Sequence, residues 1–366
     1  MAKQNCFTKV LVSLAATAVM VTAVPVATGA QTVATTKQST QKTPARATTS
    51  KSTAKKKAYS ASTARARRAT LARARAAVRA RELKDLQTPR FRVDEFGREV
   101  PDVRAEAAII YNPETGEILW ENHSKDQRSM ASITKVMTAL VFLESNTPLT
   151  TMVTIERADT RAASTTYLRN GFKLTADDLL NLLLVGSDNA AARALARASY
   201  LGYDGFIQRM NDKARELGLE STVYADPSGL LAENMSSAYD LARLIAYASA
   251  DERVSAIMRK TSFSTNVGKR MITANSTNQI VRSGDIDVVG GKTGFISRSG
   301  YCLATLLRLP QSGQQVAFVV LGAKTNASRF WETRHLFNWM ASRTKALLEG
   351  DFQNQTQQQQ QQQQQQ

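Results

Sequence analysis

The sequence predicts a mixed α/β fold, with an antiparallel sheet flanked by helices and a helical subdomain inserted between the sheet strands. Two observations predict it. Strand patterns joined by hairpin turns lie at both ends of residues 104–348, and helix patterns fill the middle of that region. A functional site is expected where the inserted helices meet the edge of the sheet.

Along the chain, strand patterns precede and follow the predicted helices. Residues 107–111 and 118–120 flank the turn signal Asn112-Pro-Glu-Thr-Gly116 and are expected to form a β-hairpin. Further strands are predicted towards the C-terminus, the last two of them joined by the turn Leu309-Pro-Gln-Ser-Gly313. These strands cover residues 287–293, 300–308 and 315–323.

The middle of the region is predicted to be helical. Thr175-Ala-Asp-Asp178 has the form of a capping box ahead of an apolar run. Ser236 or Ser237 is placed to cap a later helix, with Asp240 in its first turn. An amphipathic helix is expected to close the domain. The predicted helices cover residues 132–142, 179–185, 189–199, 203–217, 238–248 and 327–348.

Residues 1–30 are predicted to be a secretory signal peptide. Lys3 and Lys9 precede an apolar stretch over residues 10–24 that is too short for a comfortable membrane span, and small residues suit cleavage after Ala30. An uncleaved anchor is the alternative. Cleavage would release an exported protein into the periplasm or cell envelope. Its single cysteine would be Cys302, which excludes an internal disulfide.

A basic arm is predicted over residues 31–95. Sixteen Lys and Arg residues lie between positions 31 and 90 against two acids, whereas the rest of the mature chain is nearly neutral. Residues 31–60 have almost no large apolar side chains and are expected to be disordered, and residues 61–86 are rich in helix formers. We interpret the arm as a segment that binds an anionic envelope surface, with a solvated spacer as the equal alternative. The signal peptide argues against nucleic acid as a partner.

Three short motifs occur in one order within the folded region. They are Ser132-Ile-Thr-Lys135, Ser187-Asp-Asn189 and Lys292-Thr-Gly294. Each motif alone is common by chance, but the three together supply a complete acyl-transfer site without a histidine. The sequence therefore predicts a serine enzyme whose catalytic domain covers residues 96–350, followed by a disordered Gln-rich tail over residues 351–366.

Ser132 and Lys135 are the candidate catalytic nucleophile and base. Positions i and i+3 share one face of a helix, and Ser132 is expected at the helix start, where free N–H groups stabilise negative charge. A lysine accepts a serine proton only if its pKa is lowered, which burial and the positive charge of Lys292 are expected to achieve. For this motif on its own, an ordinary serine beside a surface lysine is the alternative.

Ser187 and Asn189 are the candidate catalytic residues of the second motif. Ser187 is placed to relay a proton towards the leaving group, and Asn189 to hold a substrate amide with both its donor and its acceptor. Asp188 is expected to face away and brace the turn. Taken alone, this motif would be a plain helix cap.

The third motif is the candidate substrate-binding edge. Lys292 and Thr293 are expected to bind a substrate carboxylate, by charge and by hydroxyl. Gly294 is expected to let a substrate backbone approach the strand closely. The backbone N–H groups of Ser132 and Phe295 are predicted to form an oxyanion hole.

Neither a metal nor a cofactor is expected. The two histidines, His123 and His335, are isolated, and no cluster has metal-ligand spacing. Cys302 lies on a predicted strand and is expected to be a packed core residue rather than a reactive thiol.

Residues 104–345 resemble a known family through five stretches. These are Ala131-Ser-Ile-Thr-Lys-Val-Met-Thr-Ala139, Gly186-Ser-Asp-Asn189, Asp226-Pro-Ser-Gly-Leu230, Asn275-Ser-Thr-Asn278 and Gly291-Lys-Thr-Gly-Phe295. The family is that of the low-molecular-mass penicillin-binding proteins, serine D-alanyl-D-alanine peptidases, and the D,D-endopeptidase branch is the most similar. The resemblance implies a serine β-lactamase-like sandwich as the fold. The chain stops soon after the last predicted helix, without the β-rich C-terminal domain of many carboxypeptidase relatives, which favours the endopeptidase branch.

The same resemblance implies a mechanism. Ser132 would attack the carbonyl of a D-alanine followed by a D-amino acid in a peptidoglycan stem peptide, and water would release the acyl-enzyme. β-Lactam antibiotics would acylate the same serine. The sequence leaves open whether the enzyme cleaves cross-links or trims the terminal D-alanine.

Two other classes of protein are alternatives. A β-lactamase would use a glutamate-held water, but the interval between the second and third motifs lacks the expected Glu-x-x-Leu-Asn. A non-catalytic wall-binding or β-lactam-sensing module would keep the cleft without turnover. Rapid hydrolysis of a chromogenic β-lactam would favour the first of these alternatives.

Overall fold

The computed structural model describes residues 51–364 of the 366-residue chain. The predicted signal peptide and residues 31–50 of the predicted arm lie outside the described residues. The chain divides into two units, residues 1–69 and 70–366, and the fold below is that of the second unit. In the described residues, no helix combines the length and the apolar character that a membrane span requires.

A five-stranded antiparallel sheet forms the centre of this unit and confirms the predicted α/β fold. Its strand order is β11-β12-β13-β3-β4, so strands from both ends of the folded region are neighbours. The two ends join where β13 pairs with β3, with Val319 opposite Ile109. The strands are β3 (Ala107–Tyr111), β4 (Ile118–Asn122), β11 (Val288–Ile296), β12 (Gly300–Arg308) and β13 (Gln315–Ala323).

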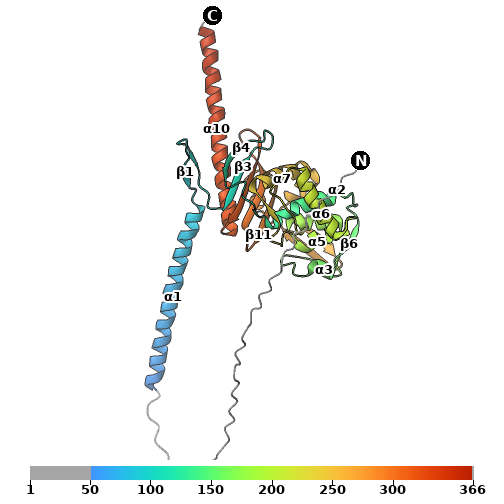
Figure 1. The fold of residues 1–366 in the computed structure, drawn as a ribbon. Coiled ribbons are helices and arrows are strands. Elements are labelled where there is room, and N and C mark those ends of the chain that lie inside the picture. Colours follow the sequence, from blue (N-terminus) through green and yellow to red (C-terminus); the bar gives the residue numbers. More distant parts are fainter. Residues whose placement is uncertain (1–50, 365–366) are drawn as a thin grey trace, which may run out of the picture. The chain divides into compact units, whose positions relative to one another are not determined.

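Helices cover both faces of the sheet. Figure 1 shows α10 against one face and the inserted helices, among them α2, α5, α6 and α7, on the other side. The helices of this part are η1 (Ala131–Thr134), α2 (Lys135–Glu144), α3 (Arg157–Thr160), α4 (Ala176–Val185), α5 (Asn189–Ala198), α6 (Gly202–Glu216), α7 (Ala238–Ala250), α8 (Glu252–Met258), α9 (Gln279–Ser283) and α10 (Asn326–Gln364).

The central strands alternate their side chains between two hydrophobic cores. On β3, Ile109 packs with the inserted helices, and the next residue, Ile110, packs in the core that contains the α10 side chains. On β13, Val319 and Phe318 are divided in the same way. Because successive side chains of a strand point to opposite faces, a sheet buried on both sides requires the continuous apolar runs seen in these strands.

Local capping signals begin two helices where the sequence predicted them. Thr175 and Asp178 form a capping box at the start of α4. The Ser237 side chain accepts a hydrogen bond from the backbone N–H of Asp240 at the start of α7. Cys302 is buried in β12, which confirms that it is a core residue.

Three elements differ from the prediction. Helix α1 (Lys51–Gln87) begins at Lys51, inside the range expected to be disordered, and α10 continues to Gln364 through the Gln-rich segment that was also expected to be disordered. Ala, Lys, Arg and Gln are all good helix formers, so neither composition interrupts a helix. The helix expected from residue 132 begins as the 3-10 turn η1, and α2 starts at Lys135.

Several short strand pairs were not predicted. The longest is the hairpin of β9 (Ser262–Val267) and β10 (Arg270–Asn275), whose residues are largely polar and partly exposed. With few apolar side chains, these strands show too weak a two-residue period to be recognised. The other pairs are β1 (Phe91–Val93) with β2 (Glu99–Pro101), β5 (Arg128–Ser129) with β8 (Met235–Ser236), and β6 (Met152–Thr154) with β7 (Lys173–Thr175).

Candidate active site

Ser132 lies in the 3-10 turn η1, immediately before α2. The preceding residue, Ala131, has a φ of 48°, a left-handed value that is uncommon for a residue other than glycine. Lys135 opens α2, and its Nζ donates a hydrogen bond to Ser132 Oγ at 2.9 Å. Side chains at i and i+3 eclipse each other in a 3-10 turn, which brings the predicted nucleophile and base together.

The Lys135 ammonium makes three hydrogen bonds inside the protein. Besides Ser132 Oγ, its acceptors are Asn189 Oδ1 at 2.6 Å and the Ser228 carbonyl oxygen at 2.5 Å. The side chain is fully buried. These three acceptors match the three donors of an ammonium and hold Nζ in a single place, and when the amine is neutral the Ser132 hydroxyl is the partner that can donate to it.

Burial lowers the pKa of Lys135 to about 7. The carboxylates of Asp226 and Asp188 oppose this shift, and the positive charge of Arg193 adds to it. A large fraction of the amine is therefore neutral near neutral pH, which is the form that accepts a proton from a serine. Arg193 was not singled out from the sequence.

Lys292 is the second buried lysine of the site. Burial lowers its pKa well below the usual value, and the charges of Lys135 and Arg329 lower it further. Because the repulsion between two positive charges is mutual, it disfavours the state in which Lys135 and Lys292 are both charged. A carboxylate bound beside Lys292 would favour its charged form again.

The stretch 226–230 packs against the turn that carries Ser132, which is called the nucleophile turn below. The Gly229 backbone has a φ of 77°, and a Cβ atom there would lie 2.0 Å from the Ala131 carbonyl oxygen. The Asp226 carboxylate holds the turn by accepting from the backbone N–H of Ser228 and of Gly229. This turn presents the Ser228 carbonyl to Lys135. The sequence marked the stretch only as part of a family resemblance, because nothing local shows what it packs against.

The second motif begins in a left-handed residue, Ser187, with a φ of 58°. Asp188 caps α5 by accepting from the Ala191 N–H, and its carboxylate also accepts from the Tyr167 N–H at 2.6 Å. Asp188 therefore braces the turn and the segment opposite, as predicted.

Asn189 contacts other parts of the protein through both ends of its side-chain amide. Its Oδ1 accepts from Lys135, and its Nδ2 donates to the Ala163 carbonyl oxygen at 2.7 Å. The side chain is buried, so both ends of the amide are engaged with the protein. The Asn189 amide therefore joins Lys135 to the segment that contains Ala163.

The third motif lies on β11, at the edge of the sheet. Lys292 Nζ donates to Ser187 Oγ at 2.8 Å, which joins the second and third motifs. The Thr293 hydroxyl lies 2.6 Å from the hydroxyl of Thr277. Phe295 is 48% exposed and stacks on Tyr301 with ring centroids 4.1 Å apart. Phe295 thus forms an exposed aromatic surface at the end of the motif.

Gly294 is needed for contact with the protein itself. A Cβ atom at this position would lie 2.7 Å from the Met130 carbonyl oxygen and 3.3 Å from the Ser132 nitrogen. The missing side chain therefore lets the nucleophile turn pack against β11, whereas the sequence argument had assigned the space to a substrate backbone.

Arg329, from α10, is a buried residue of the site that the sequence analysis missed. Its Nη1 donates to the Gly294 carbonyl at 2.8 Å and to the Cys302 carbonyl at 3.1 Å. Through these two hydrogen bonds, Arg329 fixes the backbone of the third motif and of the strand next to it. Its distance along the chain from every motif explains why no local pattern indicated it.

The three motifs form two linked pairs. Ser132 is bonded to Lys135, which Asn189 orients, and Ser187 is bonded to Lys292. The first pair offers a hydroxyl bonded to a buried amine of lowered pKa, and the second offers a hydroxyl that accepts a hydrogen bond from the buried Lys292 amine. Acyl transfer requires a nucleophile, a base and a proton-transfer path, and the two pairs offer a candidate for each.

Comparison with known proteins supports this chemistry. Residues 94–325 match the family described as D-alanyl-D-alanine carboxypeptidase. The D-alanyl-D-alanine endopeptidase of Haemophilus influenzae is 34% identical over 228 residues, which cover 62% of this chain and 78% of that protein. The endopeptidase of Escherichia coli is 29% identical over 66% of this chain and 78% of its own length.

Solved structures show the same relationship. A DD-transpeptidase from Streptomyces is 27% identical and superimposes with a TM-score of 0.61, over 65% of this chain and 97% of that one. A D-alanyl-D-alanine carboxypeptidase from Mycobacterium tuberculosis is 26% identical, with a TM-score of 0.61 over 66% of this chain and 93% of that one. All three motifs lie inside the matched region, and the chain therefore belongs to the D-alanyl-D-alanine carboxypeptidase family and is a serine D,D-peptidase.

Proposed function

We propose that this enzyme hydrolyses D-alanyl-D-amino acid bonds in peptidoglycan cross-links through an acyl-enzyme on Ser132. The hydrogen bond of 2.9 Å between Lys135 Nζ and Ser132 Oγ carries the proposal, because it joins the hydroxyl to an amine that is substantially neutral near pH 7. The related proteins named endopeptidases, from Haemophilus influenzae and Escherichia coli, favour cross-links as the substrate.

Acylation follows from the first pair of residues. Ser132 Oγ attacks the D-alanine carbonyl carbon while its proton passes to neutral Lys135. The backbone N–H groups of Ser132 and Phe295 stabilise the negative oxygen that develops. The C–N bond then breaks, and the leaving amine takes the proton that Lys135 received from Ser132, relayed by the hydroxyl of Ser187, which Lys292 holds by a hydrogen bond. Lys135 is thereby neutral again.

Release of the acyl group reverses these roles. Lys135 accepts a proton from water as the water attacks the ester carbon, and Ser132 regains a proton as its oxygen leaves. In the enzyme–substrate complex, Lys292 and Thr293 bind the carboxylate on the leaving-group side. β-Lactams acylate Ser132 in the same way, because the strained amide takes the place of the scissile bond.

Digestion of purified, cross-linked muropeptides, followed by mass spectrometry, tests the proposal. Conversion of cross-linked dimers to monomers is expected, and Ser132→Ala should abolish both this conversion and labelling by a fluorescent penicillin. Removal of a single terminal alanine from pentapeptides, with dimers intact, would make the enzyme a carboxypeptidase. Penicillin binding without any digestion would favour a non-catalytic module.

Export and envelope attachment are part of the same proposal. Residues 1–30 direct the chain to the periplasm, and residues 31–90 attract it to an anionic envelope surface. In support, the arginine side chains along residues 65–81 of α1 are exposed, and only two acids lie within residues 31–90. Co-sedimentation should be seen with phosphatidylglycerol vesicles at low salt and should be lost at high salt. Equal binding to phosphatidylcholine vesicles, or none to either, would leave the arm a solvated spacer.

A further inference from the structure

A strained segment lies between α3 and the site. Ala162 and Ser164 both have left-handed φ values, of 52° and 36°. Neither is a glycine, so this conformation is unfavourable and persists only where surrounding contacts hold it. Residues 161–164 are called the bridging segment below.

One end of the bridging segment is bonded to the second motif. The Ala163 carbonyl accepts from Asn189 Nδ2 at 2.7 Å, and the Thr165 carbonyl accepts from the Asn189 backbone N–H at 3.0 Å. The same Asn189 accepts from Lys135 through Oδ1. A change in the bridging segment would therefore turn the Asn189 amide and move the acceptor of Lys135.

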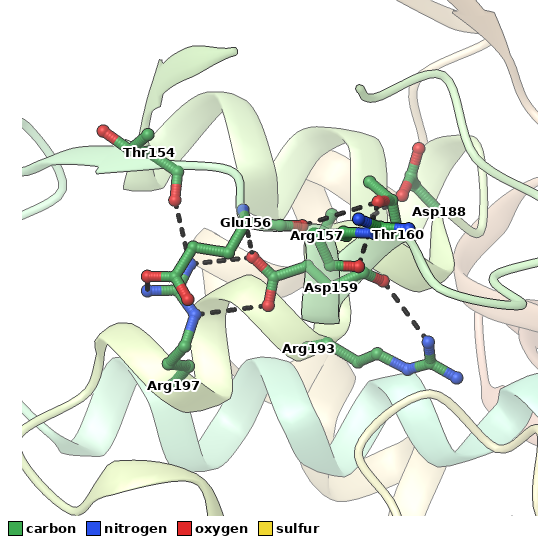
Figure 2. Close-up of polar contacts among 9 residues, drawn as sticks. Thr154, Glu156, Arg157, Asp159, Thr160, Asp188, Arg193 and Arg197 are labelled. Carbon is green, nitrogen blue, oxygen red and sulfur yellow. Dashed lines mark hydrogen bonds and ion pairs between the residues drawn. The ribbon is translucent and has the colours of Figure 1, made fainter. Parts of the chain in front are cut away.

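The other end is bonded to α5 by two arginines one helical turn apart. Arg193 Nη1 donates to the Arg161 carbonyl at 2.6 Å and more weakly to the Asp159 carbonyl at 3.3 Å. Arg197 forms a two-pronged ion pair with the Asp159 carboxylate, through Nε at 3.2 Å and Nη2 at 2.7 Å. Figure 2 shows both arginines extending towards the Asp159 segment.

Asp159 itself is only 2% exposed, so its carboxylate is shielded from water and is bonded to protein partners instead. Its carboxylate also accepts from the Glu156 N–H at the start of α3. Arg197 extends the contact by donating to the Thr154 carbonyl at 2.8 Å (Figure 2). The residues before the bridging segment are thus held firmly to α5.

We propose that Arg193 and the Asp159–Arg197 pair are positioning residues, which hold the bridging segment in its strained conformation and thereby keep Asn189 aligned on Lys135. The inference rests on the proposed role of Lys135 as the base. It adds that helix α5 orients Lys135 in two ways. Its first residue, Asn189, bonds to Lys135 directly, and Arg193 and Arg197 act indirectly by holding the bridging segment.

Charge gives Arg193 a second effect. The charged groups that face Lys135 are Asp226 before β8, Asp188 at the start of α5, Arg193 on α5 and, on β11, Lys292. The charge of Arg193 lowers the pKa of Lys135, whereas the two carboxylates raise it. Removal of the Arg193 charge would therefore raise the pKa of Lys135. A purely structural arginine would not affect the pH at which the base loses its proton.

The test compares Arg193→Gln and Arg193→Lys in the full-length protein, by the rate of acylation with a fluorescent penicillin from pH 5 to 9. Arg193→Gln is expected to lower the rate by about 10- to 100-fold, as a displaced catalytic group does, and to move the acid limb of the profile to higher pH. Arg193→Lys keeps the charge, so its acid limb should stay near the wild-type position. Arg253→Gln, a surface arginine on α8 with a 60% exposed side chain, is the matched control.

A second substitution separates positioning from general loss of structure. Glycine adopts left-handed φ values freely, so Arg193→Gln combined with Ala162→Gly should recover acylation about 5-fold or more over Arg193→Gln alone. Wild-type rate and pH profile in Arg193→Gln would overturn the inference. So would a slower Arg193→Gln that shows neither the pH shift nor this recovery. Retention of acylation by Lys135→Ala would instead refute the proposed function, so the two failures are distinguishable.

Discussion

A methyl group on Gly294 would lie 2.7 Å from the carbonyl oxygen of Met130, closer than a Cβ atom approaches a backbone oxygen in real proteins. The third motif and the turn that carries the nucleophile are therefore in direct backbone contact. The distance between the sheet edge and Ser132 is set by the absence of one side chain.

Gly294→Ala is accordingly expected to push the nucleophile turn away from β11. A displacement of this kind costs about 100-fold in rate when it misplaces a reacting group. Labelling by a fluorescent penicillin should become slow while the melting temperature falls little. Gly205→Ala in α6 is the matched control, since a methyl group there would have its nearest neighbour at 3.6 Å. Normal labelling of Gly294→Ala would show that the turn can shift without loss of function.

The rate of acylation should depend on pH through Lys135. Only the neutral amine accepts the Ser132 proton, and the pKa of Lys135 is lowered by burial to about 7. The rate is therefore expected to fall about 10-fold for each pH unit below that value. Stopped-flow measurement of the acylation rate from pH 5 to 9 gives the acid limb of the pH–rate profile. A rate independent of pH over this range would mean that another group accepts the proton.

Stability should rise with pH over a defined range. The unfolded chain keeps Lys135 protonated up to its ordinary pKa of 10.5, whereas the native protein has released this proton above about pH 7. Within that window the unfolded state binds more protons, so the free energy of unfolding increases with pH. Urea denaturation at pH 7, 8 and 9 tests this, and Lys135→Met should flatten the slope. Equal slopes for the two proteins would contradict the buried, neutral amine.

Gly229→Ala should damage the fold rather than the chemistry alone. The new methyl group would lie 2.0 Å from the Ala131 carbonyl oxygen, and the backbone there has a left-handed φ of 77°. Both effects oppose the native structure, with a combined cost of about 3 kcal/mol or more. Thermal unfolding should show a clear loss of stability. An unchanged melting temperature would mean that the turn over residues 226–230 moves freely.

The sequence was informative where the physical signal is local. The strands 300–308 and 315–323 were predicted at their observed bounds, because long apolar runs between turn residues permit few other structures. The caps at Thr175 and Ser237 depend on residues within three positions. The hairpin of β9 and β10 was missed because the few apolar residues that it packs on the core, such as Val267 and Ile272, are scattered among polar ones.

The active site shows the same contrast between local signals and contacts that arise only on folding. Ser132 and Lys135 were paired correctly from their spacing, and the role of Asp188 followed from its place at a helix start. The contact between Asn189 and Ala163 did not follow, because Ala163 lies on a separate segment that folding brings to it. Arg193 and Arg329 act through carbonyl groups, and a carbonyl has no signature in a sequence.

The sequence by itself therefore determined the residue types of the site, their order and the class of reaction. The tertiary structure decided which groups touch: Lys135 with Ser228, Lys292 with Ser187, and Gly294 with Met130. It also decided the pKa of Lys135, since that value depends on burial and on charges from several elements. The physical reason is that desolvation and backbone contact are properties of three-dimensional packing, whereas a motif records only which side chains are available.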